Sequence, residues 1–84
     1  MYWLDEELVQ MPSIVEYHIA RLKDKNPEVR IKAARELGLL GDVSALEALE
    51  ELFRAETDPE VKKVAQQAGL ALYKKKRELE SAEG

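Results

Sequence analysis

Residues 26–49 read NPEVRIKAARELGLLGDVSALEAL, and this stretch decides the fold. Asn26 offers a side-chain oxygen to the first turn of a helix, and the proline after it fits the first helical position because its missing N–H would be unpaired there. Gly41 suits the left-handed residue that follows a helix C-terminus. Ser44 and Glu47 have the spacing of a capping box, which predicts that the next helix opens at Ser44. The stretch therefore predicts two helices, at about 27–40 and 44–56.

The same kind of boundary recurs on both sides of this stretch. Asp58-Pro59 repeats the Asn-Pro pair, and Ser13 stands ahead of an apolar segment that ends at Leu22. The loops between these segments are short, so neighbouring helices should pack antiparallel. The sequence thus predicts an all-α protein. We expect helices at about 14–24, 27–40, 44–56 and 59–80, with a weaker one near 4–11.

The chain also repeats itself. The run from Asn26 to Arg30 recurs as Asp58 to Lys62, at an offset of 32 residues. The helices that precede these two runs match at an offset of 30, which aligns Ile19 with Leu49, for example. Helix–turn–helix units with a period near 30 residues indicate an α-solenoid.

These residues resemble a HEAT repeat of the short bacterial and archaeal kind, which also occurs in phycobilisome-lyase-type proteins. Asn-Pro-x-Val-Arg, Ala-Ala, Leu-Gly and Gly-Asp stand in register in the first repeat, whereas the second lacks the Gly-Asp ending. The resemblance covers roughly residues 13–73 and implies a short α-solenoid of about two antiparallel helix pairs that binds other proteins. It also implies that Arg30 and Asp42 belong to a polar ladder between stacked repeats. The recognised lyases are longer and work as pairs, so lyase activity does not carry over to this chain.

The composition argues against catalysis, metal binding, nucleic-acid binding and membrane contact. The 84 residues include 17 acidic and 13 basic side chains, for a net charge of −4, which argues against nucleic acid as a partner. Cysteine is absent and His18 is the only histidine, so we expect no metal site, no cofactor and no enzyme activity. No apolar run approaches the ~20 residues that a membrane span needs, and the N-terminus is acidic where a secretory signal carries lysine. These features predict a cytoplasmic protein that makes no membrane contact.

An acidic surface is the first candidate binding site. In the HEAT stacks that the sequence resembles, the outward sides of the second helices line a concave groove. On those helices this sequence places mostly glutamates, namely Glu16, Glu47, Glu50 and Glu51, together with Arg54. An acidic groove would suit a partner with a basic surface. The alternative is an ordinary solvated face, which charge runs usually form.

The N-terminal aromatic residues are the second candidate. Tyr2 and Trp3 stand at the start of the chain, and Tyr17 lies on the first strongly predicted helix. Aromatic side chains bury large areas and are enriched at the centres of interfaces. The alternative is that Tyr2 and Trp3 fold back to cover the open edge of the helix at 14–24, where Tyr17 would otherwise be in water.

We expect a single domain over residues 1–84, made of an N-terminal edge at 1–12, repeats at 13–73 and a projecting charged tail at 74–84. The leading hypothesis is an adaptor or a small accessory subunit of a larger assembly, or a homodimer. One alternative is a lyase- or chaperone-type subunit that positions a prosthetic group. The other is a weak nucleic-acid binder that uses Arg30, Lys32, Arg35, Lys62 and Lys63.

Overall fold

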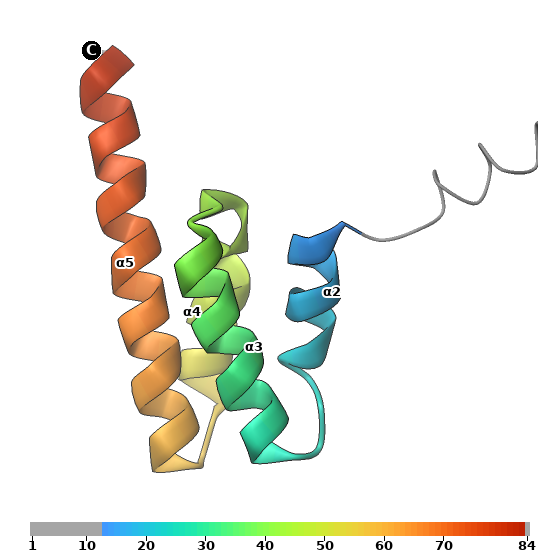
Figure 1. The fold of residues 1–84 in the computed structure, drawn as a ribbon. Coiled ribbons are helices and arrows are strands. Elements are labelled where there is room, and N and C mark those ends of the chain that lie inside the picture. Colours follow the sequence, from blue (N-terminus) through green and yellow to red (C-terminus); the bar gives the residue numbers. More distant parts are fainter. Residues whose placement is uncertain (1–12, 84) are drawn as a thin grey trace, which may run out of the picture.

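The computed structural model describes residues 13–83, which form four α-helices and one short 3₁₀ turn (Figure 1). The helices are α2 (Ile14–Arg21), α3 (Pro27–Leu40), α4 (Leu46–Ala55) and α5 (Pro59–Glu83), and the 3₁₀ turn η1 (Val43–Ala45) precedes α4. No strand occurs in this part of the chain, which confirms the predicted all-α class. The helix predicted near 4–11 lies outside the described residues.

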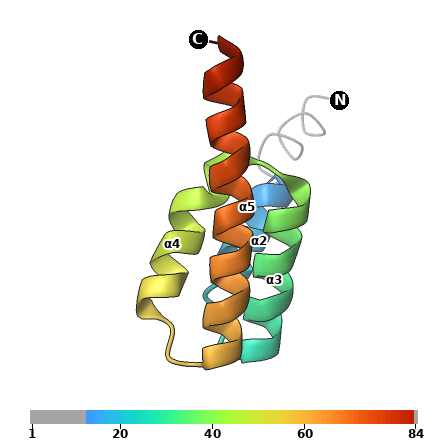
Figure 2. The same cartoon turned by 90° about the vertical axis from the view of Figure 1, so that its left-hand side faces the viewer.

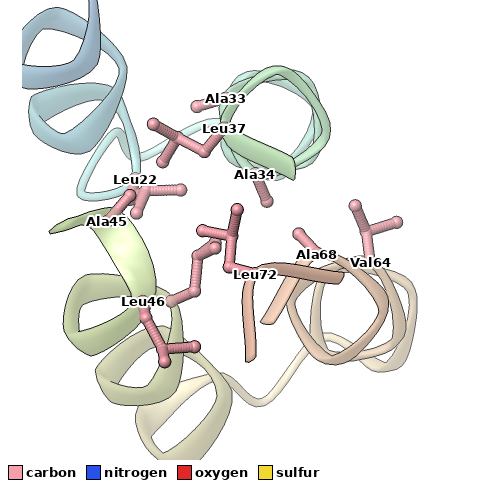
Figure 3. Packing of buried hydrophobic residues seen from close by; sticks show 10 residues of the cluster. Leu22, Ala33, Ala34, Leu37, Ala45, Leu46, Val64, Ala68 and Leu72 are labelled. Carbon is pink, nitrogen blue, oxygen red and sulfur yellow. The ribbon is translucent and has the colours of Figure 1, made fainter. Parts of the chain in front are cut away.

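The four helices surround one core. α3 packs beside both α2 and α5, and α5 also packs beside α4. Looking along the helices, Figure 3 shows α3 and α5 on one side of the core and α2 and α4 on the other. Figure 2 shows α5 rising past the other helices. This arrangement is a short solenoid of antiparallel helix pairs.

Apolar side chains from every helix meet in this core (Figure 3). Leu37 of α3, Leu49 of α4 and Leu72 of α5 are fully buried, and Leu22 joins them from the turn after α2. Alanines fill the positions between the leucines, which allows the helices to approach closely. Ala71, next to the buried Leu72 on α5, is exposed.

Three of the predicted helix caps are confirmed. The side chains of Ser13, Asn26 and Asp58 accept hydrogen bonds from backbone N–H groups at 3.1, 2.9 and 2.9 Å, respectively. Gly41 is left-handed, with φ of 71°, and ends α3. Each of these groups satisfies a backbone polar group that a helix end would leave unpaired.

The predicted start of α4 is wrong. Asp42, not Ser44, supplies the cap, because its carboxylate accepts the backbone N–H of Ser44 at 2.9 Å. The chain then makes the 3₁₀ turn, and α4 begins at Leu46 without a side-chain cap. A carboxylate is a stronger hydrogen-bond acceptor than a hydroxyl, which explains why the residue after Gly41 takes this role.

Two other boundaries also differ from prediction. α2 ends at Arg21 instead of residue 24, because Asp24 turns the chain by accepting the backbone N–H of Asn26 at 2.8 Å. α5 continues to Glu83, past the predicted end near residue 80. Two of the three residues from 81 to 83 are alanine and glutamate, which are strong helix formers.

Candidate protein-binding surfaces

An apolar groove runs between α4 and α5. Its volume is about 340 Å³. Leu49 and Ala65 are buried at its floor, whereas Leu70 and Tyr73 on its α5 side are 60% and 48% exposed. The remaining lining residues are Leu46, Glu50, Phe53, Arg54, Gln66 and Gly69. Exposed apolar side chains beside a hollow of this size are typical of a surface that binds another molecule.

Gly69 keeps this groove open. A methyl group placed on its Cα would meet no atom within 4 Å. Phe53 forms the opposite wall, and the Lys62 ammonium lies 4.9 Å from the centre of its ring. A helix surface without a side chain allows the backbone of a second helix to come close.

A second, smaller groove lies between α2 and α4. Its volume is about 260 Å³, and it is lined by Ile19, Leu22, Lys23, Ala48, Glu51, Leu52 and Ala55. Ile19, Ala48 and Leu52 also pack against the core. This hollow lies between the second helices of successive repeats, where the resemblance predicts a concave groove.

The predicted acidic residues do not share one groove. Glu50 and Arg54 line the α4–α5 groove and form an exposed ion pair at 3.9 Å. Glu51 lines the α2–α4 groove, and Glu16 and Glu47 are exposed but line neither. Whether any of them binds a partner stays a prediction.

A third surface, the α2–α3 edge, is more polar than the two grooves. It encloses about 450 Å³ and is lined by Tyr17, His18, Arg21, Lys32, Ala33, Arg35 and Glu36. Tyr17 accepts a hydrogen bond from Arg21 at 3.1 Å and contacts the His18 ring edge-on, with centroids 5.2 Å apart. The His18 Nδ1 atom is buried without a hydrogen-bond partner in the part of the chain that the structure describes. The other predicted aromatic contacts, Tyr2 and Trp3, lie outside the described residues.

The resemblance placed Arg30 and Asp42 in a polar ladder between stacked repeats, and the Arg30 side chain contacts Glu56, not Asp42. Its guanidinium binds the Glu56 carboxylate at 2.8 and 3.0 Å, and also the backbone carbonyl oxygens of Asp24 and Lys25 at 2.7 and 3.1 Å. Burial acts to raise the pKa of Glu56, but hydrogen bonds from Arg30 and from the backbone N–H of Asp58 outweigh it and hold that pKa below its ordinary value. The arrangement joins the α2–α3 turn to the α4–α5 turn, which is a structural role.

The basic residues of the nucleic-acid alternative are divided among several surfaces. Arg30 forms an ion pair with Glu56. Lys32 and Arg35 line the α2–α3 edge, and Lys62 lies over the ring of Phe53. A nucleic-acid binder needs its cations gathered on one face. The arrangement therefore does not favour this alternative.

Lys75 of the projecting tail has contacts that we did not expect. A methyl group placed on Gly41 would lie 2.8 Å from its Nζ atom. The pKa of Asp42 is lowered by hydrogen bonds from Ser44 and, to a smaller extent, by the nearby charge of Lys75. A cation suits this position because the C-terminus of α3 carries a partial negative charge.

Sequence reasoning missed the α4–α5 groove. Leu70 is exposed, and a single exposed leucine taken by itself does not indicate a binding surface. The available signal was its spacing from Tyr73, because residues three apart share a face of a helix. The second signal was Gly69 next to it, in the interior of a predicted helix.

Among residues 13–83 no helix is long and apolar enough to cross a membrane. Nor do three histidine, aspartate or glutamate side chains in that range come together as metal ligands.

Comparison with known proteins gives one match. A family model described as HEAT repeats matches residues 4–68. Comparisons with curated proteins and with solved structures give no match. The narrower resemblance to phycobilisome-lyase-type repeats stays a prediction.

Proposed function

Because the chain belongs to the HEAT-repeat family, we propose that it is a non-enzymatic adaptor or accessory subunit, and that the α4–α5 groove binds a helix of its partner protein. HEAT repeats generally mediate protein–protein interaction. The observation that carries the proposal is the apolar groove of about 340 Å³ with Leu70 and Tyr73 exposed along it.

The composition of the groove supports a protein partner. Apolar and aromatic side chains occupy its centre, and Glu50, Arg54 and Gln66 supply polar groups. Protein interfaces commonly combine an apolar centre with a polar rim, and tyrosine is enriched among their strongest contacts.

The internal repeat supports a helix as the bound element. Leu49 of α4 lies in one buried cluster with Leu22 and with Leu37 of α3, so α4 shares the core of the preceding helices. Helices α4 and α5 are the repeat equivalents of α2 and α3. The α4–α5 groove is therefore the next equivalent position along the stack, and an amphipathic helix would pack there as α4 packs on its own neighbours.

The charge on α4 favours a partner helix with basic residues beside its apolar face. Glu47, Glu50 and Glu51 lie on this helix, and only Arg54 offsets them. Opposite charges on an interface speed association and favour one register, although they add little affinity when exposed to solvent.

A groove-filling variant tests this proposal. Partners cross-linked to the tagged wild-type chain are identified by mass spectrometry, purified and titrated against Gly69→Leu, which places a side chain in the groove without touching the core. We expect binding to weaken at least tenfold, a loss of about 1.4 kcal/mol. Leu39→Asp is the matched control, because Leu39 is 76% exposed and lies outside the groove. Equal affinities of wild type and Gly69→Leu would refute the proposal.

A further inference from the structure

We infer that residues 1–12 of the same chain dock on the α2–α3 edge and cover it. This inference goes beyond the proposed function, and it concerns a different face from the α4–α5 groove. It assigns Tyr2 and Trp3 to an internal contact, which leaves the groove as the surface for a partner.

The position of the segment is the first reason. Residue 12 is joined directly to Ser13, whose side chain caps α2 at 3.1 Å, so the segment begins at the N-terminus of one of the two helices that form this edge. A segment tethered this closely has an effective concentration in the millimolar range, on the order of that for short flexible linkers. The family match also begins at residue 4, so most of the segment belongs to the repeat array.

Charge complementarity is the second reason. Arg21, Lys32 and Arg35 line the edge, with Glu36 as the one acidic residue among them. The segment contains Asp5, Glu6 and Glu7 and no basic residue. The acidic outer side of α4, in contrast, would repel it.

Apolar complementarity is the third reason. Ile14 and Tyr17 are 57% and 47% exposed on the outer side of α2. In the segment, Leu4, Leu8 and Met11 have a spacing that places them on one face of a helix, and Trp3 precedes them. Docking that face on α2 would remove apolar surface from water on both sides, which favours the contact.

Trp3 allows a direct test, because it is the only tryptophan of the chain. Its fluorescence emission and its quenching by acrylamide are measured on the full chain. We expect a blue-shifted emission and weak quenching in the wild type. The double variant Lys32→Glu plus Arg35→Glu should shift the emission to the red and raise the quenching constant severalfold. Both substituted residues are exposed, so the variant should stay folded, which circular dichroism would check.

Two further variants sharpen the test. The matched control is Lys74→Glu plus Lys76→Glu, which makes the same change of charge on the exposed far end of α5 and should leave Trp3 protected. Adding Asp5→Lys, Glu6→Lys and Glu7→Lys to the Lys32→Glu plus Arg35→Glu variant should restore protection.

Three results would overturn the inference. The first is a wild-type Trp3 that is quenched as strongly as a free tryptophan derivative, and the second is protection that the Lys32→Glu plus Arg35→Glu variant leaves intact. The third is protection that disappears on dilution, which would assign the contact to the segment of a second copy. None of these results affects the groove experiment, because the two tests use different residues.

Discussion

Arg30 shows how a single side chain can join turns that are distant in the sequence. Its guanidinium contacts Glu56 and two carbonyl oxygens of the α2–α3 turn, and the Arg30 and Glu56 side chains are only 18% and 5% exposed. The resemblance predicted a structural role for Arg30 but named Asp42 with it. Glu56 could have been found, since it aligns with Asp24 at the repeat offset of 32 residues.

Replacing Glu56 by glutamine should lower the free energy of unfolding by about 1–3 kcal/mol at pH 7, because the Arg30 charge loses its partner. The folded-state pKa of Glu56 is lowered, so its contribution is complete above the ordinary pKa of glutamate and is lost as the pH falls through the folded-state value. Urea unfolding of wild type and Glu56→Gln between pH 7 and pH 2 would measure this, and the two curves should converge at low pH.

The matched control for this prediction is Glu50→Gln. Glu50 pairs with Arg54 at 3.9 Å, but the two side chains are 54% and 66% exposed. Exposed pairs one helical turn apart contribute about 0.3–0.5 kcal/mol. A Glu56→Gln variant no less stable than Glu50→Gln would contradict the role of the Arg30–Glu56 pair.

At the scale of the helices, two glycines in similar sequence settings have opposite roles. A methyl group on Gly38 of α3 would lie 3.1 Å from the Cβ atom of Ala68 on α5, so glycine is needed where these helices cross. Gly69 on α5 faces open space in the α4–α5 groove. The sequence predicts both residues to be helical, but only the packing of α3 on α5 distinguishes them.

The same substitution should therefore have opposite effects on the two helices. Gly38→Leu should lower the free energy of unfolding by about 1–3 kcal/mol through overpacking. Gly69→Leu should raise it by roughly 0.5–1 kcal/mol, because leucine is the better helix former. Thermal unfolding followed by circular dichroism would measure both. Equal effects at the two positions would contradict the close approach of α3 and α5.

At the scale of the whole molecule, one continuous core joins the two repeats. Leu37 of α3 lies in the same buried cluster as Leu22, Leu49 and Leu72. The sequence predicted that the chain forms a short stack of helix pairs. It did not predict the groove between α4 and α5, because α4 and α5 each contribute part of its wall.

Because the core is shared, removing its centre should destabilise all helices together. Leu37→Ala should cost about 2–5 kcal/mol, as for other fully buried leucines. Hydrogen exchange should show protection falling in α2 and α5 by the same amount. Leu39→Ala, two residues away and 76% exposed, should change stability by less than about 0.5 kcal/mol. Loss of protection confined to one repeat would contradict a single cooperative core.

The sequence by itself determined the helical class, the repeat and most helix boundaries, because caps, prolines and apolar spacing act within a few residues of one another. Only the tertiary structure decided the partner of Arg30, the different roles of Gly38 and Gly69, and the placement of Leu70 and Tyr73 beside Phe53. Each of these depends on contacts between helices that are separated in the chain. Such contacts follow from how the helices pack, and a local sequence pattern does not contain that information.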